Sequence, residues 1–185
     1  MENFYQYFGY NSIFILSYFF VSFVIFILNH VTKDRLNKYF FSTYRSSPLH
    51  ILTYVRLLGH SIGHMDWKHF MNNFTFILLI GPLVEEKYGT IPLLCMCCIT
   101  SVVIGIVNSI LSKNRIEGAS GIVFMLIVLS SFVNIENGKI PLTLILIFMF
   151  YIVDEILDGL KGKENVSHLA HIVGAICGGF FGFFI

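Results

Sequence analysis

The sequence is poor in charged residues. Asp, Glu, Lys and Arg make up only 12% of its 185 residues, about half of their share in a typical soluble domain. This shortage excludes an ordinary water-soluble domain and a disordered chain, because both depend on abundant charge. The net charge of +1 gives no bulk attraction to nucleic acid or to an acidic partner, so we expect no nucleic-acid binding.

Cysteine is also scarce, and its positions exclude two further classes. The cysteines all lie in apolar stretches, at Cys95, Cys97, Cys98 and Cys177. A disulfide framework would place them in loops, and a zinc site would need spaced pairs with polar neighbours. We expect the first three to be small buried hydrophobic side chains, and we predict no bound metal or cofactor.

Apolar residues make up 56% of the chain, and the mean hydropathy is +0.76. Lipid is therefore the expected solvent for most of the surface. Six stretches contain no Asp, Glu, Lys or Arg: 3–32, 69–84, 88–112, 118–135, 140–153 and 165–185. A membrane-crossing helix needs about 20 residues, and the short second and fifth stretches suffice if charged ends reach the headgroups. The prediction is an all-α membrane protein of six transmembrane helices, in one domain over 1–185.

The ends and connections of these stretches refine the prediction. Lys33 is the first basic residue, so the N-terminus lacks the basic region of a cleavable signal peptide, and we expect a retained membrane helix. Apolar runs without alternation exclude membrane β-strands. The first connection, about residues 30–68, is long and has no clear helical period. We expect it to be partly embedded in the membrane.

Polar residues within the apolar stretches converge at one depth. The second, fourth and sixth stretches cross in the same direction, so their N-terminal ends share one face of the membrane. His69 and Asn73 lie four residues apart in the first turns of the second stretch, on one helix face, and both can donate hydrogen bonds. Ser120 lies in the first turn of the fourth, and His171 lies about two turns into the sixth, roughly 10 Å below its start. Because intramembrane polar groups are costly, this convergence predicts a functional cavity.

A serine and a histidine in one cavity indicate nucleophilic catalysis. His171 could take the proton of the Ser120 hydroxyl near neutral pH. Gly118 and Gly121 flank the serine and permit a tight turn at the helix start. The free N–H groups and positive dipole of that helix end would stabilise a developing oxyanion, together with the two donors of the second stretch.

Glycines in the last stretch predict close helix packing. Gly174, Gly178 and Gly182 recur every four residues, which gives a smooth surface that a neighbouring helix can approach closely. His171 lies one turn before Gly174 on this stripe. We expect the helix that carries Ser120 to be the neighbour, since catalysis needs the serine oxygen about 3 Å from a histidine nitrogen.

Other interpretations of the same residues remain open at this point. A GxSG in a membrane protein can serve helix packing alone, and an interfacial histidine is commonly just a hydrogen-bonded polar residue. The pairs His60 with His64 and His168 with His171 have spacings that could ligate a metal. No HExxH motif is present, so the sequence does not predict an intramembrane metalloprotease.

Taken together, these motifs resemble the rhomboid family of intramembrane serine proteases, in the compact six-helix form common in bacteria. The resemblance covers nearly the whole chain from the first connection onward. Four segments carry it: His60 to Asn73 with its HxxxN element, Gly81 with Glu85 to Gly89, the GxSG of Gly118-Ala119-Ser120-Gly121, and the AHxxGxxxG of Ala170-His171 through Gly174 to Gly178.

The resemblance implies a Ser–His dyad without an aspartate, with Ser120 as nucleophile and His171 as general base and then acid. It implies an oxyanion pocket made by His69, Asn73 and the backbone N–H of Ser120, and no cofactor. Substrates would be single-pass transmembrane proteins, cut in or near their transmembrane segments, usually after a small residue. The implied setting is a bacterial plasma membrane, crossed several times; the oligomeric state stays open.

Two positions depart from the family pattern. Many members carry a Trp-Arg pair in the first loop, for which Tyr44-Arg45 is the nearest equivalent here, so the anchoring of that loop is in question. Phe124 stands four residues after the serine, where tyrosine is frequent. A phenylalanine can still stack on the catalytic histidine, but it offers no hydroxyl.

The distribution of basic residues conflicts with the resemblance. Ten of the twelve lie in connections on the side of the predicted site, and only Lys87 and Lys139 lie on the other. The positive-inside rule would turn the site toward the cytoplasm. The resemblance implies an extracytoplasmic site with both termini cytoplasmic. We adopt that orientation, because the first connection is long and is expected to be embedded rather than freely translocated.

Two rival functions fit parts of the pattern. A catalytically silent rhomboid-like protein would bind membrane clients without cutting them, although such proteins usually lack the serine or the histidine. A small transporter could use intramembrane histidines to move a metal or protons, although it predicts inverted repeats or broken helices that the sequence does not clearly contain. The leading prediction is the protease.

Overall fold

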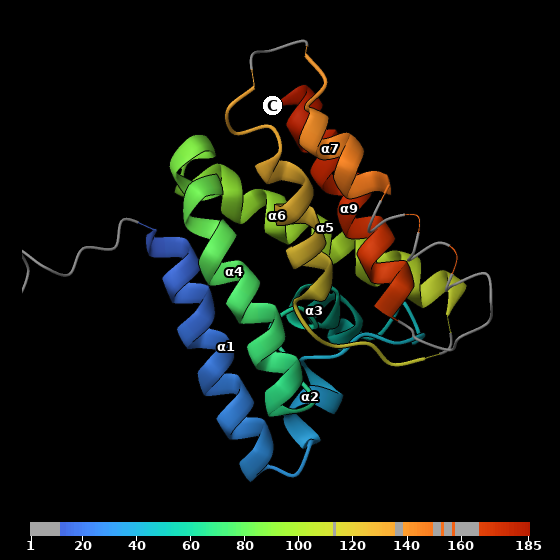
Figure 1. Ribbon diagram of the computed structural model, residues 1–185. Coiled ribbons are helices and arrows are strands. Elements are labelled where there is room, and N and C mark those ends of the chain that lie inside the picture. Colours follow the sequence, from blue (N-terminus) through green and yellow to red (C-terminus); the bar gives the residue numbers. More distant parts are fainter. Residues whose placement is uncertain (1–11, 113, 136–138, 150–152, 154–156, 158–166) are drawn as a thin grey trace, which may run out of the picture.

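The computed structural model describes residues 12–112, 114–135, 139–149, 153, 157 and 167–185, and its regular structure in these ranges is helical (Figure 1). The helices are α1 (Ile13–Val31), α2 (Arg35–Tyr39), α3 (Ile51–Gly59), α4 (Trp67–Tyr88), α5 (Thr90–Leu111), α6 (Ser120–Ser130), α7 (Leu142–Ile147) and α9 (Ser167–Phe184). An isolated β-bridge between Thr43 and Ile116 is the one extended pairing there. The prediction of an all-α fold is confirmed.

The helix α6 lies between α4 and α9 and packs against both (Figure 1). The N-terminal ends of α4, α6 and α9 all point toward the lower end of the molecule in this view, where α2 and α3 also lie, and the C-terminus lies at the opposite end. This common direction agrees with the one predicted from the alternation of the uncharged stretches. It brings the beginnings of three helices that are far apart in sequence to one end of the fold.

A buried carboxylate joins α1 to the end of α4. Glu85 is 3% exposed, and its two oxygens accept hydrogen bonds from the backbone N–H groups of Phe14 and Ile15, each at 3.0 Å. The first N–H groups of a helix have no partner within it, and a negative charge there also complements the helix dipole. The hydroxyl of Thr90, the first residue of α5, donates to the same carboxylate at 2.8 Å. One side chain thus ties together three helices.

The glycine stripe of α9, defined by Gly174, Gly178 and Gly182, packs directly on α6. A Cβ placed on Gly174 would lie 2.0 Å from the carbonyl oxygen of Gly121, and one on Gly178 would lie 2.5 Å from the carbonyl oxygen of Met125. Backbone therefore lies against backbone, which only glycine permits at this separation. The prediction that the serine-bearing helix packs into this stripe is confirmed.

Among the described residues, two helices, α1 and α5, are both long enough and apolar enough to cross a membrane. The helix α6 has 11 residues, or about 17 Å at 1.5 Å per residue, and the apolar part of α9 is also shorter than a full span. The predicted fifth stretch, 140–153, lies partly outside the described residues, and α7 within it has six. Six crossings and a single domain over 1–185 both stay predictions.

The first connection contains structure that its sequence did not reveal. It forms α2 and α3, of five and nine residues, which are too short to produce a clear period. Its anchor is Arg56, which is 6% exposed. The Arg56 guanidinium donates to the Tyr39 carbonyl at 3.0 Å and lies 4.5 Å from the ring centre of Tyr44. Arg45 is exposed and instead donates to the carbonyls of Ser109 and Ile110 at the end of α5.

The prediction for the cysteines is wrong at two positions. Cys97 is buried, but Cys95 and Cys98 are exposed. All three lie on α5, where residues one and two positions apart point in different directions. A continuous apolar run on a helix that contacts lipid has an outward face as apolar as its inward face, so hydrophobicity alone cannot identify the buried side.

Candidate active site

A tight turn introduces Ser120, the first residue of α6. Gly118 has φ +120°, a conformation that favours glycine. Its N–H donates to the carbonyl of His60 at 2.8 Å. The N–H of Ala119 donates to Nε2 of His64 at 3.3 Å. Two residues of the first connection thus hold the turn that precedes the serine. The first N–H groups of α6, like those of any helix, have no acceptor within the helix.

The hydrogen bonds of these two histidines define different tautomers. Nε2 of His64 accepts from Ala119, so the proton is on Nδ1, which donates to the Ile62 carbonyl at 3.1 Å. Nε2 of His60 donates to the Ser101 carbonyl at 2.9 Å. Burial lowers the pKa of His64 to about 3, with the neighbouring His69 adding to the effect, and burial lowers the pKa of His60 to about 4. Both rings are neutral at pH 7.

His69 and Asn73 lie against the turn, in the first turns of α4. The N-cap of this helix is Asp66, whose carboxylate accepts from the His69 N–H at 2.8 Å. A Cβ placed on Gly118 would lie 2.6 Å from Nε2 of His69 and 3.4 Å from Nδ2 of Asn73. Asn73 is 5% exposed, and its Nδ2 is buried with no acceptor among the described residues. A buried amide without a partner is uncommon, and this one lies beside the turn that carries Ser120.

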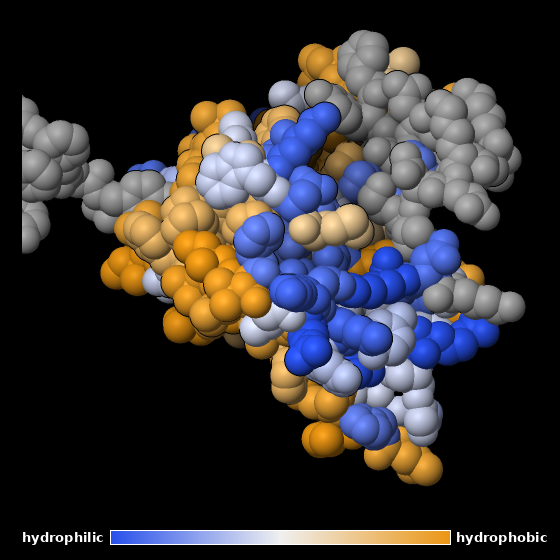
Figure 2. Space-filling view, turned by 90° about the horizontal axis from the view of Figure 1, so that it is seen from below, coloured by the Kyte–Doolittle hydropathy of each residue, from blue (hydrophilic) through white to orange (hydrophobic). Residues whose placement is uncertain are grey.

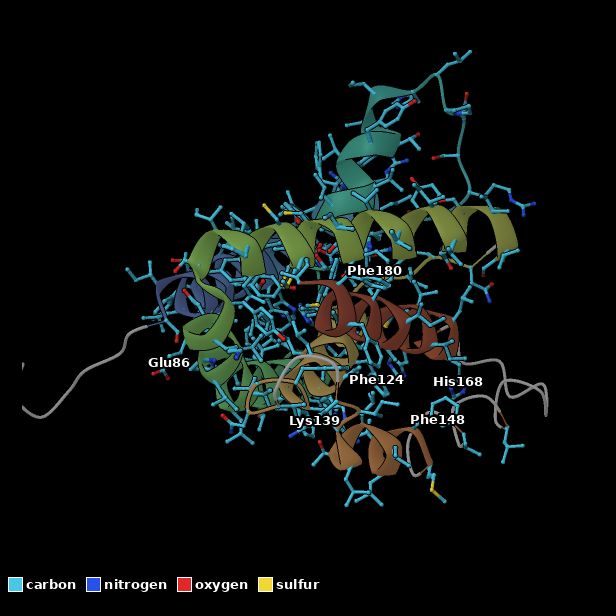
Figure 3. All side chains as sticks on the ribbon, turned by 90° about the horizontal axis from the view of Figure 1, so that it is seen from above. Glu86, Phe124, Lys139, Phe148, His168 and Phe180 are labelled. Atoms are coloured by element: carbon cyan, nitrogen blue, oxygen red, sulfur yellow. The ribbon has the colours of Figure 1, made fainter. Side chains whose placement is uncertain are left out.

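His171 reaches the same helix from α9. Its ring stacks on that of Phe124 with ring centres 4.2 Å apart and an interplanar angle of 10°, and Figure 3 shows Phe124 alongside α9. Phe124 is four residues after Ser120, so both lie on one face of α6. The described part of α9 begins at Ser167, and His171 lies about one turn after this residue. The predicted depth of about two turns counts from residue 165, which lies outside the described residues.

A cavity of about 230 Å³ lies at this end of the fold. Four of the predicted site residues line it: Ser120, His69, Gly118 and Gly121. Ala170, the residue before His171, also lines it. Asn73 adjoins the cavity through Gly118, and Gly174 adjoins it through Gly121. Gly178 lies against Met125 further along α6, so its contact belongs to helix packing and not to the cavity.

The cavity is also lined by two charged residues, which the sequence did not single out as site residues. Arg115 and Glu117 are part of its wall, and they form an ion pair that also includes Asp34. Burial raises the pKa of Glu117, against the opposing influence of Arg115. The hydrogen bond from Arg115 is the main cause that lowers the pKa of Asp34. In sequence, the one available signal was that Glu117 directly precedes the GxSG.

Ring nitrogens of His60 and His64, one of the two histidine pairs with a metal-binding spacing, bind protein groups instead of offering a free pair of ligands. Nε2 of His60 and both ring nitrogens of His64 take part in hydrogen bonds to protein groups. Within the part of the chain that the structure describes, no group of three or more His, Cys, Asp or Glu side chains could hold a metal ion.

The face that carries this end of the fold is polar at its centre. Figure 2 shows hydrophilic residues gathered there, with apolar residues flanking them. The exposed charged residues of the first connection include Lys33, Asp34, Arg35, Lys38 and Arg45. In a chain whose helices are mostly apolar, this arrangement places the cavity at an end of the fold that carries many exposed polar groups.

Most of the chain matches a known family model. The family model described as Rhomboid domain matches residues 52–185, and the chain belongs to the rhomboid family, a family of membrane-embedded proteins. It is similar to Rhomboid-like protein 11, chloroplastic, of Arabidopsis thaliana, at 29% identity over 130 residues that cover 62% of this chain and 46% of that protein. It is also similar to Rhomboid protease GlpG of Haemophilus influenzae, at 24% identity over 131 residues that cover 69% of this chain and 68% of that protein. The chain thus aligns with about half the length of the first relative.

Proposed function

We propose that this protein is an intramembrane serine endopeptidase. In this proposal Ser120 is the nucleophile and His171 the general base and acid, while the oxyanion is held by His69, Asn73 and the backbone N–H of Ser120. The observation that carries it is the stacking of His171 on Phe124, one helical turn from Ser120. Because the glycine stripe lets α9 lie directly on α6, the histidine sits over the helix face that begins with the serine.

The proposed reaction divides peptide hydrolysis into two steps. His171 removes the hydroxyl proton of Ser120 as the serine oxygen attacks the carbonyl carbon of the substrate, and a tetrahedral oxyanion forms. The C–N bond then breaks as His171 gives its proton to the leaving amine. Water attacks the resulting ester with His171 again as base. His171 then gives this proton to the serine oxygen as the ester C–O bond breaks, and the carboxylic acid and free serine are released.

The unpaired amide of Asn73 suits the oxyanion role. Its Nδ2 is buried without a partner, a state that costs free energy in the resting protein. A developing negative oxygen beside Gly118 would supply the missing acceptor, so the interaction would be stronger in the transition state than before it. His69 on the preceding turn of α4 could donate from the same side.

Substrates are proposed to be single-pass membrane proteins whose transmembrane segments are cut in or near the bilayer. A transmembrane helix must unwind locally to expose a peptide bond, so helix-weakening residues should favour cleavage. The name of the Haemophilus influenzae relative, a protease, supports the activity. We further propose six crossings, a first connection partly embedded in lipid, and a site open to the extracytoplasmic side of a bacterial plasma membrane.

The experiment is co-expression with tagged single-pass substrates and labelling of the purified protein by a fluorophosphonate. We expect cleavage and labelling by the native chain. Ser120→Ala and His171→Ala should reduce cleavage about a thousandfold or more. Ser130→Ala is the matched control, because Ser130 lies at the other end of α6 and donates to the Ile127 carbonyl. Cleavage that persists in Ser120→Ala would refute the mechanism.

The orientation has a separate test. A tag on the C-terminus should be inaccessible from outside intact cells and become accessible on permeabilisation. A tag that reacts in intact cells would show that the basic residues, and not the family expectation, decide the orientation.

A further inference from the structure

The residues just before Ser120 form hydrogen bonds with the first connection at several points. Ile116 and Thr43 exchange two backbone hydrogen bonds, both 2.9 Å long. The Gly118 N–H donates to the His60 carbonyl, and the next N–H donates to His64, as described above. Residues 118–120 are here named the serine turn. Their position is therefore set by these hydrogen bonds to the first connection.

An ion-pair network of Asp34, Arg115 and Glu117 also joins the first connection to the segment before Ser120. The guanidinium of Arg115 donates to both carboxylate oxygens of Asp34, at 2.7 and 2.9 Å. It also donates to Oε2 of Glu117. The Glu117 side chain is 2% exposed, whereas that of Asp34 is 53% exposed. The network thus runs from the surface at the end of α1 to a buried carboxylate whose backbone directly precedes Gly118.

Stability alone is a poor explanation for this network. Burying a carboxylate and a guanidinium costs solvation free energy that their attraction regains only in part, and apolar replacements of both partners are commonly neutral or stabilising. What a hydrogen-bonded ion pair supplies that an apolar pair does not is a fixed direction. Oε2 of Glu117 accepts from Arg115, which fixes the direction of this carboxylate.

We propose that Arg115 and Glu117, anchored by Asp34, are positioning residues that set the orientation of the serine turn. They fix the backbone at Glu117, and hence the direction of the Gly118 peptide and of the N–H groups that follow it. A displacement of about 1 Å at a reacting group can cost about 100-fold in rate. This inference rests on the proposed protease function, because it assigns a role to the turn that carries the nucleophile.

The first test compares three single variants in detergent or in liposomes. Glu117→Gln and Arg115→Met should each lower kcat about tenfold while KM changes less than about twofold, since binding surfaces are retained and the transition-state geometry is not. Arg115→Lys should recover part of the loss, because an ammonium can still bridge two carboxylates, although without the bidentate geometry. The rate of fluorophosphonate labelling should fall in parallel with kcat.

The matched control is Arg35→Met. Arg35 is an exposed arginine next to Asp34 in the sequence, and it should retain wild-type kcat and labelling. A second variant, Arg115→Met with Glu117→Leu, removes both members of this ion pair, of which Glu117 is buried and Arg115 is partly exposed. We expect it to fold with an unfolding midpoint equal to or above that of the wild type, yet to keep the tenfold lower kcat.

The outcomes separate this inference from the function on which it rests. If the wild type is labelled at Ser120 and the double variant has wild-type kcat, the positioning role is refuted and the protease function stands. The same conclusion follows if kcat falls only in proportion to the folded fraction. If the wild type shows neither labelling nor cleavage that depends on Ser120, both proposals are overturned.

Discussion

The two ends of α6 are held by different forces. At its N-terminal end, the His60 carbonyl and the His64 ring of the first connection bind the serine turn. Arg115 pairs there with Glu117, in the segment just before the turn. Along the rest of the helix, the glycine stripe of α9 brings backbone against backbone, and Gly182 lies against the ring of Phe132. The interactions at the N-terminal end are directional and involve titratable groups, whereas the packing along the rest of α6 depends on the shape and size of the side chains.

This difference indicates how the serine turn can be placed accurately inside an apolar protein. Dispersion contacts between helices are strong in sum but have little directional preference, so the stripe sets how close α6 and α9 lie without orienting a peptide group. Hydrogen bonds orient, but each buried polar group must be satisfied. The glycine stripe thus sets the distance between α6 and α9, and the hydrogen bonds at the N-terminal end of α6 set the direction of the serine turn.

The largest effect should come from filling the stripe. Gly174→Ala places a methyl group where the Gly121 carbonyl lies 2.0 Å away, and because both partners are backbone the helices must separate. We expect a loss of about 3 kcal/mol or more in unfolding free energy, measured by denaturant or thermal unfolding in detergent, and loss of labelling at Ser120.

Gly179→Ala is the control on the same helix. No atom lies within 4 Å of a Cβ at that position, and alanine is favoured over glycine in a helix by about 1 kcal/mol. Equal stability of the two variants would show that the close approach of α6 and α9 does not hold the fold.

The next largest effect should be a loss of unfolding free energy at acidic pH, caused by the buried histidine that binds the serine turn. The pKa of His64 in the folded protein is about 3, below the unfolded value of about 6.5. The folded ring stays neutral while the unfolded one takes up a proton, so this contribution to stability is complete above pH 6.5 and decreases as the pH falls toward 3. Between pH 7 and 5, His64 should remove about 2 kcal/mol of unfolding free energy.

Unfolding measured at several pH values checks this. His60, whose pKa is about 4, should contribute in the same direction, so His64→Gln should reduce the acid-dependent loss without abolishing it. His50→Gln controls for removing a histidine at an exposed position of the first connection. An unaltered pH dependence in His64→Gln would contradict the assigned role of the neutral ring.

A smaller effect is expected where the two regions meet, at Phe124. Phe124→Ala removes the ring against which His171 stacks, and a lost aromatic pair is worth about 0.5–1.5 kcal/mol. Because the histidine would be less well oriented, kcat should fall about tenfold, as measured by substrate cleavage. Phe124→Tyr keeps the stack and should retain wild-type kcat. If Phe124→Ala were as active as Phe124→Tyr, stacking would not orient the histidine.

The smallest effect is expected at Arg45. It is exposed and binds carbonyls at the end of α5, away from the serine turn, so Arg45→Met should change unfolding free energy by about 0.5 kcal/mol or less. Arg56→Met is the comparison, because Arg56 is buried and bonded to the Tyr39 carbonyl, and it should cost clearly more. The reverse order would restore Arg45 as the anchor of the first connection.

The part of the fold that was predictable depends on local patterns. Uncharged stretches predicted the helical class, and the four-residue period of the glycine stripe predicted the contact between α9 and α6. Family motifs carried the candidate residues Ser120 and His171, whose catalytic roles stay a proposal. Failures occurred where a local pattern is ambiguous. Short helices such as α2 have no visible period, and Cys95 and Cys98 look buried because lipid-facing and core-facing residues share one composition.

By itself, the sequence predicted a membrane-embedded chain whose structured segments are helices, and it determined which small and polar residues interrupt them. These properties follow from composition and from spacing within a single helix. Tertiary structure decided which groups hold the serine turn, because the partners are distant in the chain: His64 and Ala119 are 55 residues apart, and Asp34 and Arg115 are 81 apart. No periodicity relates such positions, and only the folded chain brings the Asp34 carboxylate to Arg115 and the neutral His64 ring to the serine turn.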